Sequence, residues 1–201
     1  MLLLIVNAWI GFSVPAAAES LTITVLGDSL TAGYGLDRGD AFPARLEAAL
    51  EKSGVPARVV GAGVSGDTTS GGLSRLDWAL SEKPDLVIVE LGANDGLRGI
   101  DPALSEKNLD RIVARIKERG IKVLLTGMKA PPNMGRDYAD AFAAIFPAVA
   151  EKHDVPFYPF FLEGVAANPA LNQDDAKHPN AEGVAVIVEN ILPYVKDALG
   201  K

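Results

Sequence analysis

Apolar residues along this chain fall into two alternating patterns. Short runs rich in Leu, Ile and Val have the length and composition of β-strands. One of them, Leu86–Leu91, is apolar at almost every position, as in a strand that is buried on both faces. The predicted strands span residues 21–26, 57–60, 86–91, 122–126 and 157–158.

Longer segments with apolar residues at helical spacing separate these runs. Asp40 is expected to cap the first helix, and Pro84 ends the second because proline cannot continue a helix. Asp101-Pro102 supplies the third helix with a capping side chain followed by proline at the first helical position. Trp78 is expected on the core face of the second helix. The predicted helices span residues 41–53, 73–80, 102–119, 138–152 and 181–199.

Strand and helix thus alternate five times, with no internal repeat, linker or low-complexity tract. This order predicts an α/β fold in which helices cover both faces of a parallel, five-stranded sheet, a three-layer α/β/α sandwich. A chain of 201 residues is long enough for one such domain and short for two.

Glycine-containing or polar turns follow the predicted strands, at the edge where open α/β sheets bind ligands. Ser29 comes just after the first strand, in the stretch G-D-S-L-T-A-G-Y-G. Gly66 follows the second strand and Asn94 the third. Asp175 and His178 lie in a late loop before the last helix. Because the carboxyl ends of parallel strands share one edge, these five residues are expected to meet there.

Three of these residue types suit nucleophilic acyl transfer. A serine hydroxyl becomes a nucleophile when a base such as histidine takes its proton, and a carboxylate holds that histidine. Asp175 precedes His178 by three residues, so in a tight turn its carboxylate can reach Nδ1 while Nε2 points away. Asp174 and His153 are the competing acid and histidine. His153 lies at a helix C-terminus, where a cation is favourable, and is interpreted as structural. We therefore predict Ser29, Asp175 and His178 as catalytic residues.

The negative charge that forms during acyl transfer needs hydrogen-bond donors held in place. The candidates are the backbone amides of Ser29 and Gly66 and the side-chain amide of Asn94. Gly66 lets its amide approach closely because it has no side chain. Taken singly, each has an ordinary structural interpretation: Gly66 as a turn glycine and Asn94 as a helix cap.

The composition excludes several classes of site and disfavours some partners. The net charge of −7 disfavours nucleic acid and anionic membrane surfaces as partners. Cysteine is absent, which excludes disulfides, thiolate zinc sites and a cysteine nucleophile. With two histidines in the whole chain, a multi-histidine metal centre is not expected.

Residues 1–18 have the pattern of a signal peptide. The apolar stretch Leu2–Val14 is short for a membrane span, and the small residues Ala16 and Ala18 suit cleavage just before Glu19. The basic start typical of such leaders is missing, and an uncleaved anchor or a buried helix is the alternative. We expect export to the periplasm or the medium, and a mature chain without a stable membrane span.

Four segments, taken in order, resemble the motifs of the SGNH hydrolases, the G-D-S-L lipases and esterases. They span residues 27–35, 64–69, 89–99 and 174–179. The resemblance covers the mature chain, residues 19–201, and is specifically to the bacterial thioesterase, lysophospholipase and arylesterase branch.

This resemblance implies a flavodoxin-like fold that uses no metal or cofactor. It implies Ser29 as nucleophile, His178 as base and Asp175 as the third triad member. The oxyanion hole would consist of the Ser29 and Gly66 amides and the Asn94 side chain. The substrate would be a small acyl ester or thioester, of lysophospholipid, aryl ester or thioester type, hydrolysed through an acyl-enzyme intermediate.

Other functions stay open. Residues 61–66 match the dinucleotide-binding fingerprint G-x-G-x-x-G, although Asp67 would put a carboxylate where the pyrophosphate binds and the motif follows the second strand. A catalytically inactive binding module could share the fold. A glycan O-deacetylase could use the same residues, but glycan sites usually present aromatic platforms, and Trp78 is the one tryptophan of the mature chain.

Overall fold

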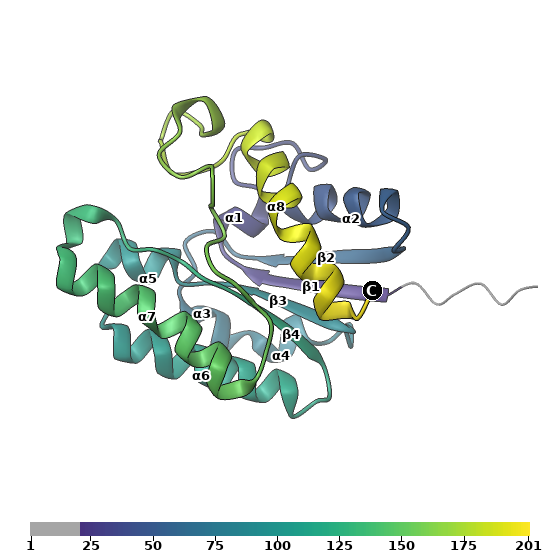
Figure 1. Cartoon of the computed structure of the whole chain (residues 1–201), viewed down its shortest axis with the longest axis horizontal. Helices are drawn as coiled ribbons and strands as arrows, with labels where there is room; N and C mark the ends of the chain where they lie inside the picture. Colours follow the sequence, from purple (N-terminus) through teal and green to yellow (C-terminus); the bar gives the residue numbers. More distant parts are fainter. Residues whose placement is uncertain (1–20) are drawn as a thin grey trace, which may run out of the picture.

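The computed structural model describes residues 21–201, so the expected leader lies outside the described residues. Five parallel strands form the central layer in the order β2-β1-β3-β4-β5. Figure 1 shows the sheet between two groups of helices, which confirms the predicted α/β fold. The strands are β1 (Leu21–Gly27), β2 (Ala57–Gly63), β3 (Leu86–Glu90), β4 (Lys122–Thr126) and β5 (Phe157–Tyr158).

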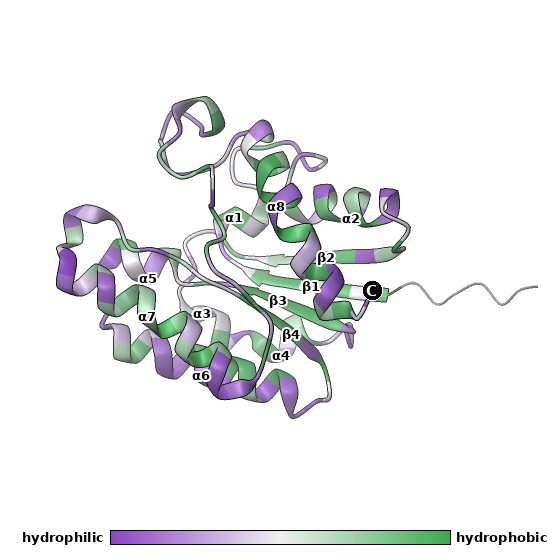
Figure 2. Cartoon of the chain, in the orientation of Figure 1, coloured by the Kyte–Doolittle hydropathy of each residue, from purple (hydrophilic) through white to green (hydrophobic). Residues whose placement is uncertain are grey.

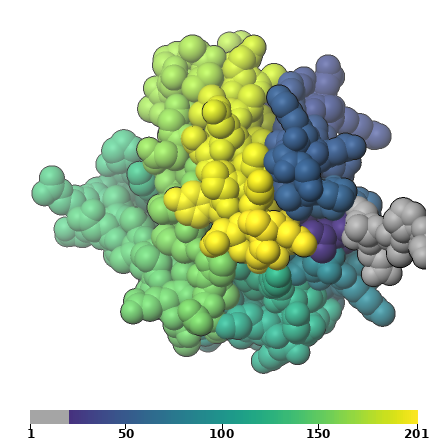
Figure 3. Space-filling view, turned by 45° about the vertical axis from the view of Figure 1, so that its right-hand side comes forward, coloured from purple at the N-terminus to yellow at the C-terminus, as the bar shows by residue number. Residues whose placement is uncertain are grey.

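Helices cover both faces of this sheet. On one face α2 (Phe42–Lys52) lies beside α8 (Ala181–Leu199), and Figure 3 shows them in blue and yellow. The other face carries α3 (Thr69–Ser74), α4 (Leu76–Ala79), α6 (Pro102–Lys117) and α7 (Arg136–His153). The short helices α1 (Ser29–Ala32) and α5 (Ala93–Arg98) follow β1 and β3, and two 3₁₀ turns span Pro132–Met134 and Pro169–Leu171.

The core lies on both sides of the central strands. Every residue of β3 is buried, as its continuous apolar run predicts. Figure 2 shows hydrophobic strands, whereas the helices carry polar residues on their outer faces. Burying one large aliphatic side chain contributes about 1.5–3 kcal/mol, so the packed layers hold the strand ends in place. This rigid frame positions the loops that follow β1, β2 and β3.

Most predicted boundaries lie within two residues of the observed ones, but the cap of α2 and the end of β2 need correction. Asp40 does not cap α2, because the helix starts after Ala41 with Pro43 in its first turn, and the Asp40 carboxylate pairs with Arg45 instead. The second strand extends to Gly63 rather than ending at residue 60. Its last residues, including Gly61 and Gly63, continue the pairing with β1 to the end of that strand.

The single helix predicted over residues 73–80 is divided into α3 and α4. Arg75 stands between them with a non-helical backbone (φ −105°, ψ 11°). Its guanidinium donates to Asp67 and to the carbonyls of Gly27 and Ala62, at 2.6–2.7 Å. The tertiary contacts of Arg75 therefore interrupt the continuous helix that the spacing of the leucines predicts.

Trp78 does not lie on the core face of its helix. Its side chain is 64 % exposed. Its neighbours explain the orientation: Leu76 and Ala79 are buried, and Asp77 turns outward to pair with Arg115 and Arg119. No helix within residues 21–201 combines the length and apolar character that crossing a membrane requires.

Candidate active site

Ser29 is the first residue of α1 and follows the end of β1 with one residue between them. Asp28 caps this short helix by accepting a hydrogen bond from the Leu30 amide at 3.0 Å. The strand therefore turns sharply into a helix at the carboxyl edge of the sheet. Serine is a nucleophile candidate here rather than the cap itself, because the neighbouring aspartate does the capping.

A continuous chain of hydrogen bonds joins the three predicted catalytic side chains. Ser29 Oγ lies 2.9 Å from His178 Nε2. On the other side of the ring, His178 Nδ1 lies 2.5 Å from Asp175 Oδ2. The serine is half-buried, and the histidine side chain is 21 % exposed. The arrangement can pass a proton from the hydroxyl to the imidazole while the carboxylate stabilises the imidazolium.

Local hydrogen bonds hold the Asp175–His178 turn. Asp175 Oδ1 accepts from the backbone amides of Lys177 and His178, both at 3.0 Å. The hydrogen bond from the His178 ring, followed by these two amide bonds, holds the pKa of the Asp175 carboxyl well below its usual range. Gln173 ties the turn to the serine loop by donating to the Tyr34 carbonyl at 2.7 Å.

Asn94 lies in α5, immediately after β3. The sheet order reverses between β1 and β3, and ligands bind at such a reversal in open α/β sheets. The neighbouring Asp95 is buried and accepts bonds from the Thr69 amide, the Thr69 hydroxyl and Ser105. These contacts anchor α5 to α3 and α6, and so they hold Asn94 in place.

Gly66 lies in the loop after β2, with φ at +81°, a conformation that favours glycine. Its carbonyl accepts a hydrogen bond from Arg98 of α5 at 2.7 Å. The Arg75 guanidinium holds the same loop through Asp67 and attaches it to the end of β1 at Gly27. The three loops that carry Ser29, Gly66 and Asn94 are therefore tied to one another.

Two buried carboxyl groups lie next to the start of α1, which begins at Ser29. Asp28 and Glu90 are both fully buried, and the Asp28 amide donates to Glu90 Oε2 at 3.3 Å. Burial raises the pKa of Asp28 to about 6. Burial, with the Asp28 charge second, raises the pKa of Glu90 well above its usual value. Burial therefore favours the protonated form of both carboxyl groups relative to an exposed carboxyl.

The competing acid and histidine lie apart from this arrangement. Asp174 is exposed. His153 ends α7, where its Nε2 lies 2.6 Å from Asp110 Oδ1. The interpretation of His153 as a structural residue at a helix C-terminus fits this contact.

Sequence reasoning overlooked several residues around the serine. The Tyr34 ring packs against the His178 ring with their centroids 4.6 Å apart. Arg75, Arg98 and Glu90 were also assigned no role. Only Glu90 had a visible signal, because a carboxylate at the end of a buried apolar strand is unusual.

The dinucleotide fingerprint does not have the backbone that its function requires. Gly61 and Gly63 lie within β2 and pair with β1, whereas the fingerprint needs its glycines in the turn after a strand. Within residues 21–201, no group of three or more His, Cys, Asp or Glu side chains is arranged to hold a metal ion.

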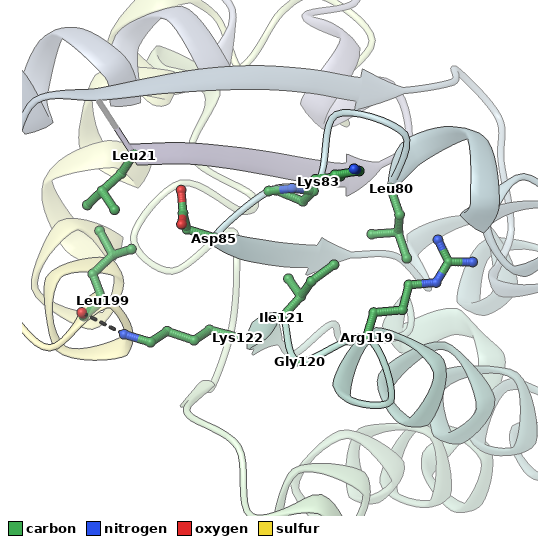
Figure 4. Close-up of a pocket in the computed structure, with 10 residues that line it drawn as sticks. Leu21, Leu80, Lys83, Asp85, Arg119, Gly120, Ile121, Lys122 and Leu199 are labelled. Carbon is green, nitrogen blue, oxygen red and sulfur yellow. Dashed lines mark hydrogen bonds between the residues drawn. The ribbon is translucent and has the colours of Figure 1, made fainter. Parts of the chain in front are cut away.

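A hollow of about 590 Å³ lies at the opposite edge of the sheet (Figure 4). Leu21, Asp85 and Lys122 line it, next to the amino ends of β1, β3 and β4, and Lys122 Nζ donates to the Leu199 carbonyl there. Ser29 is at the other end of β1, roughly 20 Å away at the usual strand rise. The hollow is therefore separate from the serine site.

Comparisons with known proteins identify the family. A family model described as GDSL-like lipase/acylhydrolase matches residues 25–186. Esterase TesA of Pseudomonas aeruginosa is 43% identical over 90% of this chain and 91% of its own length. Thioesterase 1/protease 1/lysophospholipase L1 of Escherichia coli K12 is 42% identical over 92% of this chain and 84% of its own. The crystal structure of AlinE4, an SGNH-hydrolase family esterase, superposes with a TM-score of 0.77 at 49% identity, covering 91% of this chain and 98% of that one. The chain belongs to the GDSL-like lipase/acylhydrolase family, the SGNH hydrolases.

Proposed function

We propose that in this carboxylic ester hydrolase Ser29 is the nucleophile, His178 its general base and Asp175 the carboxylate that orients the histidine. The observation that carries the proposal is the unbroken chain from Ser29 Oγ to His178 Nε2 and from His178 Nδ1 to Asp175. Serine, histidine and carboxylate in this order form the arrangement that activates a hydroxyl for attack on a carbonyl.

The reaction would proceed in two halves. Ser29 Oγ attacks the substrate carbonyl carbon as its proton moves to His178 Nε2. The imidazolium then returns that proton to the departing alcohol or thiol, which leaves an acyl group on Ser29. In the second half, water attacks the acyl carbon as His178 takes its proton. The bond from that carbon to Ser29 Oγ then breaks, and the imidazolium returns the proton to Ser29 Oγ as the carboxylic acid is released.

Stabilisation of the oxyanion is assigned to the amides of Ser29 and Gly66 and to the side chain of Asn94. Three loops supply these donors, and the bonds from Arg75 and Arg98 hold the loops before substrate arrives. Donors that need no rearrangement lower the barrier to reaction. Removal of a single such donor reduces kcat by ~10²–10³.

Apolar side chains around the serine favour a lipid-like, aryl or thioester substrate. Tyr34, Val64 and Leu97 are 45–54 % exposed, and each belongs to a loop or short helix that also carries a site residue. The names of the relatives, esterase and thioesterase/lysophospholipase, point to the same substrate class.

Glycan sites usually present aromatic platforms. Trp78 does not supply one here, because it is two residues from Leu80, which lines the hollow at the opposite edge. The exposed aromatic ring beside the site is Tyr34, which packs against His178.

The test combines one variant with one chemical label. Ser29→Ala should lower ester hydrolysis by ~10⁴ or more while the protein remains folded, because it removes the attacking atom. A phosphonate ester should add to the wild type once, at Ser29, and mass spectrometry of the digested protein locates it. Labelling of another residue, or near-normal activity of the variant, contradicts the assignment. Chromogenic esters of graded acyl length, assayed beside acetylated sugars, separate the two substrate classes.

A further inference from the structure

The side chain of Asn94 is already bonded in the absence of substrate. Its Nδ2 donates to Asp28 Oδ2 at 2.9 Å. The other oxygen of Asp28 accepts from the Leu30 amide at 3.0 Å, so both oxygens of this buried carboxylate are engaged. Asp28 therefore connects the cap of the serine helix to the carboxamide of Asn94.

This contact determines which way the carboxamide faces. An ionised carboxylate accepts hydrogen bonds and cannot donate, so it selects the nitrogen of Asn94 over the oxygen. One N–H is directed to Asp28, and the second N–H on the same planar nitrogen is left for another acceptor. An amide without such a partner could rotate by half a turn and present its oxygen to a developing negative charge.

We propose that Asp28 is a positioning residue for the reaction: its carboxylate orients the Asn94 carboxamide so that the second N–H points to the oxyanion. The proposal rests on the function proposed above for Asn94. Asp28 acts through Asn94 and does not itself contact the reacting atoms.

Glu90 stabilises the same segment through two hydrogen bonds. Its Oε2 accepts from the Thr31 hydroxyl at 2.7 Å and from the Asp28 amide at 3.3 Å, which fixes the backbone on both sides of Ser29. The charged groups that act on Asp28 are Glu90, Asp67 and His178. His178 favours the ionised form of Asp28 and Asp67 opposes it. Because the pKa of Asp28 is about 6, its carboxylate is ionised at pH 8.

The experiment compares Asp28→Asn, Asn94→Ala and the double variant at pH 8. Asparagine at position 28 retains an oxygen for the Leu30 amide but turns an NH₂ group toward Asn94. The carboxamide of Asn94 must then rotate to offer its oxygen, and its free N–H is lost from the oxyanion site. We expect kcat to fall by ~10² in both single variants, with KM changed far less. The double variant should be no slower than Asn94→Ala. Asp101→Asn is the matched control, because Asp101 caps α6 as Asp28 caps α1 but has no contact with Asn94, and its kcat should be unchanged.

The possible outcomes separate the two proposals. If Asn94→Ala keeps its kcat, Asn94 is not an oxyanion donor, and the proposed role of this residue fails first. If Asn94→Ala is slow while Asp28→Asn is normal, only the positioning role is overturned. If the two effects multiply in the double variant, Asp28 acts independently of Asn94, which also overturns it.

A second measurement does not depend on Asp28→Asn being folded. In ¹⁵N-labelled wild-type protein, the side-chain NH₂ signal of Asn94, assigned by its loss in Asn94→Ala, should shift as Asp28 is protonated, with a midpoint near pH 6. In Asp28→Ser, which retains a helix-capping oxygen, this titration should disappear. A signal that does not respond to pH in the wild type, or responds equally in Asp28→Ser, overturns the proposal.

Discussion

At the scale of single residues, two adjacent aspartates differ in whether they contact a histidine. Asp175 Oδ2 lies 2.5 Å from His178 Nδ1, whereas Asp174 points to solvent. Adjacent residues in a tight turn point in different directions, so one carboxylate at most can hold the ring. The geometry therefore distinguishes two positions that composition alone treats as equal.

Asp175→Asn should lower kcat by up to ~10⁴, since the neutral amide stabilises the imidazolium less and can favour the wrong tautomer. Asp174→Asn is the matched control and should cost far less. His153→Ala should also leave the rate nearly unchanged, because His153 is bonded to Asp110 at the end of α7. Steady-state kinetics on one chromogenic ester checks all three. If Asp174→Asn lowered kcat strongly while Asp175→Asn had little effect, the carboxylate that holds His178 would be Asp174 rather than Asp175.

The Glu90→Gln variant should become more stable relative to the wild type as pH increases. The pKa of Glu90 is raised far above its usual value of 4.5 by burial, so the native state keeps a proton that the unfolded chain releases. Wild-type stability from this group is therefore present below about pH 4.5 and is lost as pH rises toward the native pKa. Glutamine is neutral at every pH and avoids that loss.

Urea unfolding at pH 5 and pH 8 measures this effect. The difference in unfolding free energy, Glu90→Gln minus wild type, should become more positive at pH 8. Glu82→Gln, at an exposed glutamate that pairs with Arg58, is the size-matched control for the loss of one carboxylate. A difference that stays constant with pH would mean that Glu90 is ionised in the native protein.

At the scale of elements, the serine helix depends on how closely β2 approaches it. A Cβ atom added at Gly63 would lie 2.5 Å from the Ala32 amide nitrogen and 2.7 Å from the Asp28 carbonyl oxygen. Both are backbone atoms and cannot move aside without shifting α1. Glycine at the end of β2 is therefore needed by the neighbouring loop rather than by the strand itself.

Gly63→Ala should destabilise the protein by about 1–3 kcal/mol, the usual cost of overpacking, and should also lower kcat because Ser29 moves with α1. Gly39→Ala is the control, since a Cβ there meets nothing within 4 Å. Chemical unfolding and ester hydrolysis, measured on both variants, test the prediction. Wild-type stability and rate in Gly63→Ala would show that α1 adjusts freely.

At the scale of the whole molecule, the strand order brings the site together. Because β1 and β3 are neighbours, the loops that carry Ser29 and Asn94 emerge side by side at the point where the sheet order reverses. The late loop reaches this edge from the segment between β5 and α8, about 150 residues further along the chain. The predicted site residues are therefore brought together by contacts between segments that are far apart in the sequence.

We propose that the chain is exported and cleaved after Ala18, because the apolar stretch and small residues of positions 2–18 match a signal peptide. Intact-mass analysis of protein from the envelope fraction of the native host should give a chain that begins near Glu19. A soluble cytoplasmic form that retains Met1 would contradict cleavage.

Local patterns in the sequence were sufficient for the fold class and for the identity of the expected site residues. Apolar runs and helical spacing predicted five strands and the main helices, because a parallel sheet buries its strands on both faces. The order of glycine-rich and polar turns pointed to Ser29, Gly66, Asn94, Asp175 and His178, and the resemblance to the SGNH hydrolases assigned their roles.

Only the tertiary structure decided the features that depend on contacts between distant segments. Arg75 divides one predicted helix because its guanidinium binds two other strands, and Trp78 faces solvent because its helix neighbours fill the core. The pairing of Asp28 with Asn94, and of Glu90 with the serine loop, joins residues about 60 positions apart. Spacing along the chain carries no information about such contacts, because burial and hydrogen-bond geometry are properties of the packed sheet edge.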